Sequence, residues 1–197
     1  MPLDKVQVPD RGGWATFMDS LGALLDRYEE LSEDDVGYWH GEESLTASLV
    51  AAAWQGGGLG LAEFETKRVR RIREQSGKGS GDAYLRIGED WYTVEAKLCW
   101  DLDEIETSLE AARGNLRTLD VSSRAGSPIA LCYSVPMVPD QSPAHLIASK
   151  ARDLLRQIPE LDLLVAYTPL KQPPEQDGYT YPGMIALGRV RQWEKQS

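Results

Sequence analysis

The chain has 197 residues, of which 42% are hydrophobic and 26% charged, proportions typical of one compact globular domain and not of a disordered or fibrous segment. Its formal net charge is −10 at pH 7, which excludes a protein that coats nucleic acid through an overall basic surface, so a polyanionic partner must be met by a local patch. No apolar run approaches the roughly 18 to 20 residues that span a bilayer, and residues 1–13 lack the pattern of a signal peptide, so we expect a cytoplasmic protein without membrane contact.

The N-terminal third predicts two helices and a strand. Apolar residues recur every three or four positions from Trp14 to Tyr28, which predicts an amphipathic helix over residues 14–31. A second helix is expected from about residue 42 to 54, where the glycines of QGGGLG stop it, and LAEFET then forms a strand. The segment SGKGSG lacks the Gly-Lys-Ser/Thr of a phosphate-binding loop and is expected to turn the chain.

The rest of the chain predicts strands alternating with helices. Residues 81–98 alternate between apolar and polar side chains on either side of a turn, which predicts a hairpin. Further elements follow from periodicity and from apolar runs: a helix over 103–119, a strand at 128–135, a helix from 142 to 158, and strands at 162–167 and 184–190. This order predicts a single α/β domain with a mixed sheet flanked by helices, in which the helix at 14–31 is added to a core of about residues 40–170.

The predicted hairpin carries three charges where strands usually avoid them. Asp82 lies on the face opposite the apolar residues of the first strand, and Glu95 and Lys97 share one face of the second strand. With residues 88–90 as the turn, antiparallel pairing sets Asp82 opposite residues 96 to 97. Asp82, Glu95 and Lys97 are therefore expected to converge.

Such a cluster has a chemical use. Two carboxylates and a nearby backbone carbonyl, that of Ala96, form a hard oxygen site for Mg²⁺, which can activate a water and offset charge on phosphorus. Lys97 could orient or deprotonate that water, so the chemistry is hydrolysis of a phosphodiester. The alternative is a cross-strand ion pair on a solvated sheet face, which contributes about 0.2 to 1 kcal/mol.

Gly81-Asp82 followed by Glu95-Ala96-Lys97 resembles the signature of the PD-(D/E)xK nuclease superfamily, with glycine in place of the proline. The resemblance implies a restriction-endonuclease-like fold, a mixed β-sheet flanked by helices. It also implies an endonuclease or exonuclease that acts on DNA and depends on Mg²⁺, with Mn²⁺ as a substitute. Asp82, Glu95 and the Ala96 carbonyl would then be metal ligands, and Lys97 the catalytic lysine.

The resemblance covers about residues 40–135 and further implies an acidic residue near the start of the helix before the hairpin. Glu42 is the first choice, because it lies in line with Leu45 and Leu49 on the face that packs toward the sheet, and it would reach the metal directly or through water. Glu43 is the alternative. Both could equally be first-turn glutamates favoured by the helix dipole.

One concentration of positive charge stands out in this acidic chain. It lies between the strand at 61–66 and Asp82, where a phosphate backbone would pass if the metal site is correct. A solvated edge is the alternative meaning of such a run. The candidate nucleic-acid-binding residues are Lys67, Arg68, Arg70, Arg71, Arg73 and Lys78.

Cysteines and histidines point to no other chemistry. Cys99 and Cys132 lie in apolar stretches without CxxC spacing, which favours buried free thiols over a metal knuckle or a disulfide. His40 and His145 have no ligand spacing with another His or Cys, which leaves a histidine metal site or a Ser-His-Asp site without support.

The tryptophans and the oligomeric state leave alternatives open. Trp54 and Trp100 are expected in the core, whereas Trp91 fits either the core or a base-stacking platform. A nuclease that cuts two strands often needs two sites, so a homodimer or a partner protein is consistent with the sequence. The rival function is a catalytically silent nuclease-fold subunit that binds or acts as a scaffold in a larger nucleic-acid-processing or defence complex.

Overall fold

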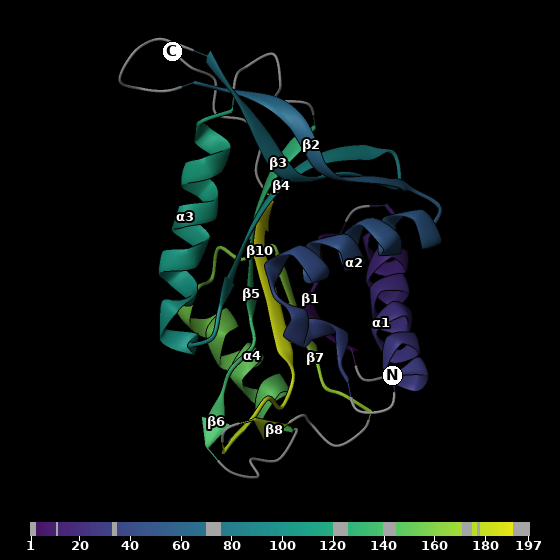
Figure 1. Ribbon diagram of the computed structural model, residues 1–197, viewed down its shortest axis with the longest axis vertical. Coiled ribbons are helices and arrows are strands. Elements are labelled where there is room, and N and C mark those ends of the chain that lie inside the picture. Colours follow the sequence, from purple (N-terminus) through teal and green to yellow (C-terminus); the bar gives the residue numbers. More distant parts are fainter. Residues whose placement is uncertain are drawn as a thin grey trace.

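A computed structural model describes residues 3–10, 12–32, 35–69, 76–119, 126–139, 145–170, 175–176 and 178–190. These residues form a seven-stranded mixed sheet with helices on both faces, and a small three-stranded sheet at one end (Figure 1). The mixed α/β class predicted from the order of the elements is therefore confirmed. None of the described helices is both long and apolar enough to cross a membrane.

The helices and strands of the described residues have the following bounds. The helices are α1 (Trp14–Leu31), α2 (Glu42–Gln55), α3 (Ile105–Arg117) and α4 (His145–Gln157), with single 3₁₀ turns at η1 (Gly37–His40) and η2 (Leu102–Glu104). The large sheet contains, in spatial order, β1 (Leu3–Gln7), β7 (Leu163–Tyr167), β10 (Met184–Val190), β5 (Ser127–Ser134), β4 (Asp90–Cys99), β3 (Ser76–Ile87) and β2 (Leu59–Val69). The small sheet contains β6 (Val138–Pro139), β9 (Tyr179–Thr180) and β8 (Glu175–Gln176).

The sheet is mixed because β4 and β5 run parallel, whereas its other neighbouring strands pair antiparallel. The parallel pair is joined through α3, as a parallel connection requires a crossover. The strand β10 lies in the middle of the sheet, between β7 and β5.

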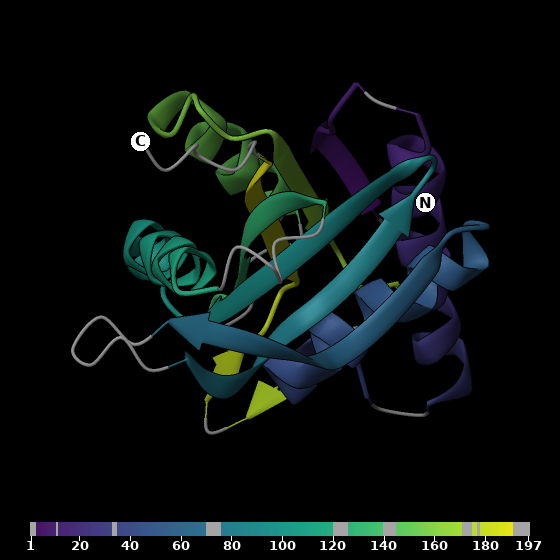
Figure 2. The same ribbon diagram turned by 90° about the horizontal axis from the view of Figure 1, so that it is seen from above.

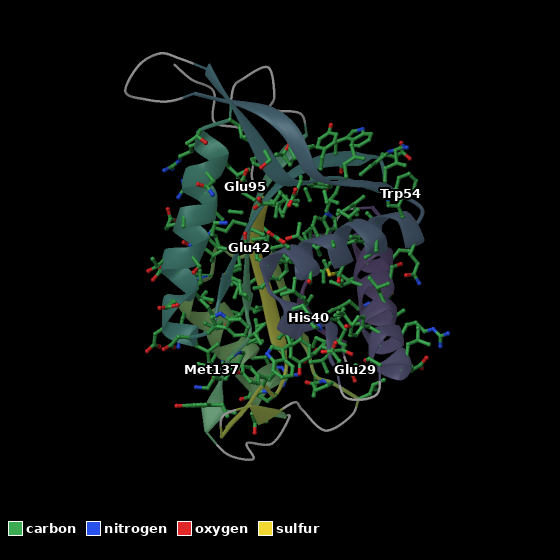
Figure 3. The ribbon with its side chains drawn as sticks, viewed as in Figure 1. Glu29, His40, Glu42, Trp54, Glu95 and Met137 are labelled. Carbon is green, nitrogen blue, oxygen red and sulfur yellow. The ribbon has the colours of Figure 1, made fainter. Side chains whose placement is uncertain are left out.

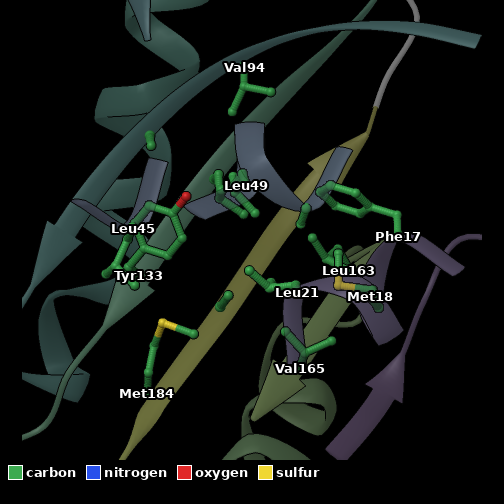
Figure 4. Close-up of a cluster of buried hydrophobic side chains, with 14 of the residues drawn as sticks. Phe17, Met18, Leu21, Leu45, Leu49, Val94, Tyr133, Leu163, Val165 and Met184 are labelled. Carbon is green, nitrogen blue, oxygen red and sulfur yellow. The ribbon is translucent and has the colours of Figure 1, made fainter. Parts of the chain in front are cut away.

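The helices form a layer on each side of the sheet (Figure 1). Alternation along the strands explains the two layers: in β7, Leu163 and Val165 face α1 and α2, whereas Leu164 and Ala166 face α3 and α4. Figure 4 shows the first of these cores, where side chains of α1 and α2 pack on the sheet. Each fully buried side chain of leucine or phenylalanine size contributes about 1.5 to 3 kcal/mol, so this layer holds the beginning of α2 firmly against the sheet.

One local prediction was wrong, and one strand was missed. The segment SGKGSG is strand and not a turn, because residues 76–80 pair with β2 in a register that includes Val69 opposite Ser76 and Lys67 opposite Lys78. The strand β1 was not predicted at all, and it forms the edge of the sheet by pairing with β7.

The two cysteines are buried, as predicted. Cys99 ends β4 and Cys132 lies on β5, and their Sγ atoms are 3.5 Å apart across the two parallel strands. Both thiols face the α3 and α4 layer, where they pack as small apolar side chains.

Candidate active site

The sheet divides where β3 leaves β4. The two strands pair antiparallel from Ile87 opposite Asp90 to Ala83 opposite Val94. Beyond Val94, β4 continues to Cys99 with β5 on one side, and no described strand pairs with its other side. The backbone groups on that open edge need other partners, because an unpaired buried N–H or C=O is costly.

Two carboxylates provide those partners. The backbone N–H of Ala96 donates to Asp82 Oδ2 at 2.7 Å, and the N–H of Leu98 donates to Glu42 Oε2 at 3.0 Å. Ala96 and Leu98 are alternate residues, so both N–H groups point to the same edge of β4. Asp82 reaches the edge from β3, and Glu42 reaches it from the first position of α2.

Lys97 lies between the two elements. Its Nζ donates to Glu42 Oε1 at 3.0 Å and to the carbonyl oxygen of Ala96 at 2.6 Å. The side chains of Lys97 and Glu42 are 31% and 32% exposed, so the ion pair is reachable from solvent. The fold thus holds an ammonium group directly beside the open edge of β4.

Glu95 completes the group that we call the carboxylate–lysine cluster: Glu42, Asp82, Glu95 and Lys97. Its side chain is only 1% exposed. Figure 3 draws Glu42 and Glu95 between α3 and α2. The structure therefore brings the three predicted hairpin charges to one place and adds the predicted glutamate of α2.

The predicted pairing of the hairpin was wrong by one to two residues. Ile87 pairs with Asp90, so the turn consists of Gly88 and Glu89 alone. Continuing the observed register by one residue places Asp82 opposite Glu95, and not opposite residues 96 to 97. Asp82 itself lies one residue beyond the last pair, where its carboxylate accepts from the Ala96 N–H.

Glu43 points elsewhere. Its side chain is exposed, whereas its neighbour Glu42 makes both contacts to β4. Of the two acidic residues considered at the start of α2, the structure therefore places Glu42 in the cluster. Its role in catalysis or metal binding stays a prediction.

Three of the six candidate phosphate-binding residues lie on the hairpin of β2 and β3. Lys67 and Arg68 belong to β2, and Lys78 on β3 is opposite Lys67. Lys78 precedes Asp82 by four residues, which at about 3.4 Å per residue is about 14 Å along the strand. Arg70, Arg71 and Arg73 lie outside the described residues.

The sequence did not indicate one polar group beside the cluster, the hydroxyl of Tyr133 on β5. Tyr133 is 1% exposed, and neither its hydroxyl nor that of Thr46 on α2 has a hydrogen-bond partner among the described residues. Burial raises the pKa of Tyr133, the Thr46 hydroxyl nearby acts in the opposite direction, and the negative charges of Glu42 and Asp82 raise the pKa further. A tyrosine inside an apolar run such as PIALCYSV gives no signal that its hydroxyl adjoins charged groups.

The donor atoms of the cluster have the chemistry that Mg²⁺ prefers. Asp82 and Glu95 supply carboxylate oxygens, and the Ala96 carbonyl keeps a second lone pair beside the one that Lys97 uses. In the described part of the chain, no three His, Cys, Asp or Glu side chains converge into a ready-made metal site. Both oxygens of Glu42 already accept hydrogen bonds, so direct binding of an ion by Glu42 would require it to release Lys97 or Leu98.

The expectation that Trp54 and Trp100 belong to the core was wrong. Trp54 is 56% exposed and donates from Nε1 to the carbonyl of Gly60, and Trp100 is 37% exposed and packs edge-on against Tyr181. Trp91, for which the sequence left both alternatives open, is 37% exposed. Apolar periodicity shows which face a side chain takes, but not whether another element covers that face.

Comparisons with known proteins supply no family for this chain. No family model matches it, and no curated protein or solved structure matches it. Its function has to be argued from the carboxylate–lysine cluster and its surroundings.

Proposed function

We propose that this protein is a metal-dependent nuclease that hydrolyses phosphodiester bonds in DNA, with a core of the restriction-endonuclease-like kind. The observation that carries the proposal is the division of the sheet at Val94, which brings Asp82, Glu95 and Lys97 together at an open strand edge. The N–H groups of Ala96 and Leu98 on that edge donate to Asp82 and Glu42, and the Ala96 carbonyl accepts from Lys97, so carboxylate and carbonyl oxygens gather at one place.

Asp82, Glu95 and the carbonyl of Ala96 would hold the ion, Mg²⁺ or Mn²⁺. A bound ion supplies positive charge that lowers the pKa of a water and offsets the charge that develops on phosphorus. Hard oxygen donors suit these ions and disfavour soft metals, which prefer sulfur.

Lys97 would act on the attacking water and on the charge of the transition state. Its ammonium group is anchored by Glu42 and by the Ala96 carbonyl, so its position is fixed before substrate arrives. Preorganised charge of this kind is an effective form of catalysis, since little reorganisation is needed during the reaction. Glu42 is accordingly a positioning residue, which acts through Lys97.

A second function is favoured by one specific observation. The contacts from Asp82 to Ala96 and from Glu42 to Leu98 satisfy the open edge of β4 without any metal, so they would stabilise the fold of a protein that binds nucleic acid and does not cut it. This protein would be a catalytically silent subunit of a larger complex. Cleavage assays distinguish the two functions, because only the nuclease would cut DNA when Mg²⁺ or Mn²⁺ is present.

The test uses purified protein with supercoiled, linear duplex and single-stranded DNA, each in Mg²⁺, in Mn²⁺ and in EDTA. We expect metal-dependent cleavage by the wild type, and a loss of about 10²- to 10⁴-fold in rate for Lys97→Ala. Asp82→Ala and Glu95→Ala should abolish cleavage as well, and double variants should be no slower than the single ones, because the residues act as a unit.

Lys5→Ala is the matched control for Lys97→Ala. Lys5 is also ion-paired, to Asp19 at 2.6 Å, and its side chain is 30% exposed, but it lies on β1 at the far edge of the sheet. The control should cut at the wild-type rate. Wild-type cutting by Lys97→Ala would reject the mechanism, and a wild type that cuts none of the substrates in either metal would favour the silent subunit.

A further inference from the structure

Three aromatic rings form a row across the hairpin strands next to the cluster. The rings of Tyr84 and Trp91 are stacked, with centroids 4.8 Å apart and an angle of 12° between planes, and Phe64 lies 5.6 Å from Tyr84 on the other side. Phe64, Tyr84 and Trp91 come from β2, β3 and β4 respectively. We call them the aromatic row.

The row lies on the face of β2, β3 and the start of β4 that is opposite α1 and α2. In β3, Ala83, Leu85 and Ile87 are buried against the α1 and α2 layer, and Tyr84 alternates with them, so its side chain points away from that layer. Figure 2 looks onto β2, β3 and β4 with α2 behind them. Trp91 is 37% exposed and Leu61 of β2 is 58% exposed, so apolar surface remains open to solvent there.

The row runs directly into the carboxylate–lysine cluster. Asp82 and Tyr84 are alternate residues of β3 and share its outer face, and Trp91 shares a face of β4 with Glu95. At the inner end, the Phe64 ring lies against the backbone of Gly81, where an added Cβ would be 2.4 Å from the ring. Glycine at position 81 therefore lets an aromatic ring lie beside Asp82.

We propose that Trp91, whose one face is backed by the stacked ring of Tyr84, offers its remaining face as a stacking platform for an unpaired base of single-stranded nucleic acid, and that the aromatic row thereby directs such strands to the carboxylate–lysine cluster. Every base offers a flat π-face, but in a duplex those faces are stacked on their neighbours and inaccessible to a row of rings. A platform of this kind thus selects for unpaired bases and tolerates any sequence.

The net charge disfavours a polyanion, and only local cations beside the row favour the same occupant. The whole chain is acidic, so stacking has to supply affinity that overall electrostatics cannot. Arg86 shares the outer face of β3 with Tyr84, and its ion pair is with Glu89, whose side chain is 93% exposed, so the guanidinium can exchange this partner for a phosphate. Lys67 and Lys78 lie further along the same hairpin.

This inference rests on the proposed function for the direction of the strand, but its test measures binding alone. Fluorescence anisotropy in EDTA would compare three labelled 20-mers: dT20, its abasic counterpart with the same phosphates and no bases, and U20 RNA. A perfectly paired duplex of the same length is the fourth probe. We expect dT20 or U20 to bind more tightly than both the abasic strand and the duplex.

The decisive variants are Trp91→Leu and Trp91→Phe. Leucine keeps apolar bulk without a π-face, so it should weaken binding of the preferred strand by about 5- to 150-fold, whereas phenylalanine should retain most of the affinity. Neither change should alter the weak binding of the abasic strand. Tyr84→Leu and Tyr84→Phe provide a second pair if the stability of Trp91→Leu is impaired, which circular dichroism would reveal.

Trp54→Leu is the matched control, since Trp54 is exposed on α2, which packs on the opposite face of these strands, and the change should leave binding unchanged. The platform is rejected if the wild type binds neither single strand better than the abasic one, or if leucine at 91 and 84 leaves affinity unchanged. A protein that binds dT20 through Trp91 yet cuts no substrate would reject the nuclease and keep the platform. A protein that cuts duplex DNA, and whose binding of dT20 is unchanged by the leucine variants, would reject the platform and keep the nuclease.

Discussion

One buried carboxylate, that of Glu29, stabilises the fold through its hydrogen bonds. Glu29 of α1 is 1% exposed and accepts hydrogen bonds from the Tyr167 hydroxyl at 2.6 Å and from the Leu170 N–H at 2.8 Å. Burial raises the pKa of Tyr167, and the Glu29 carboxylate raises it further, so the hydroxyl remains a donor. These two hydrogen bonds connect Tyr167, at the end of β7, and Leu170 to α1.

Glu29→Gln should lower the free energy of unfolding by about 1.5 to 3 kcal/mol, because it replaces hydrogen bonds to a charged group and leaves one donor poorly matched. Urea unfolding followed by circular dichroism measures the change. The control is Glu30→Gln, where the side chain is 58% exposed and pairs with Arg27, and the loss should stay below about 0.5 kcal/mol. Equal losses in the two variants would contradict a structural role for Glu29.

The residues of the candidate site could be predicted from their types and spacing, but their contacts could not. The positions of Asp82, Glu95 and Lys97 on a hairpin follow from alternation, whereas the register depended on whether the turn has two residues or three. Glu42 could be chosen over Glu43 from its helical face. The open edge of β4 and the surroundings of the buried Tyr133 hydroxyl depend on partners far away in the sequence, which no local pattern encodes.

At the level of elements, the hairpin of β3 and β4 depends on a close approach of two backbone segments. Gly88 has a φ of 61°, and a Cβ there would lie 2.3 Å from the carbonyl oxygen of Gly12. The turn therefore packs against the segment that leads into α1, and this contact is possible only without side chains. By contrast, Gly114 within α3 has no atom within 4 Å of the position that a Cβ would take.

Alanine substitution should have opposite effects at these two glycines. Gly88→Ala should destabilise the protein by at least about 2 kcal/mol, since it combines left-handed backbone strain with a clash against backbone that cannot move aside easily. Gly114→Ala should stabilise it by about 0.5 to 1 kcal/mol, because alanine loses less conformational freedom in a helix. Thermal unfolding measures the melting temperature of each variant against the wild type. A melting temperature below that of the wild type for Gly114→Ala would contradict the expected stabilisation.

Elements with strong local periodicity were predicted well, and those that depend on distant partners were missed. The helix at 14–31 and the strand at 184–190 have the predicted bounds. The strand β1 has the short, mostly polar sequence LDKVQ, and it is a strand because Leu3 pairs with Tyr167. The glycines of SGKGSG suggest a turn by composition, but pairing with β2 keeps them extended.

For the whole molecule, the balance of charge sets how it can meet a polyanion. With a net charge of −10, attraction to nucleic acid must come from a local cluster, and the basic run of residues 67–73 remains the prediction for it. If three of its arginines contact phosphates of single-stranded DNA, they should contribute about −2 to the slope of log K against log salt. Replacing Arg68, Arg70 and Arg71 by Gln should flatten the slope by that amount.

The matched control is a second triple variant that removes three positive charges from α1 and α4 and leaves the run 67–73 unchanged. Arg27, Arg152 and Arg156 are 63%, 60% and 79% exposed on α1 and α4, so their triple replacement by Gln removes the same charge far from the hairpin. Anisotropy titrations of dT20 over a range of NaCl concentrations give both slopes. Equal slopes in the two triple variants would show that the run 67–73 is a solvated edge.

The central position of β10 has a consequence for how the chain can be assembled during synthesis. The ribosome makes the N-terminal part first, yet β10, the last described strand in the sequence, is the one that joins β5 to β7. Until residues 184–190 have emerged, the nascent sheet consists of two separate parts, each with an unpaired edge facing the other. The strand β10 thus closes the sheet at its centre, and a chain made only as far as residue 183 exposes strand edges that are prone to aggregation.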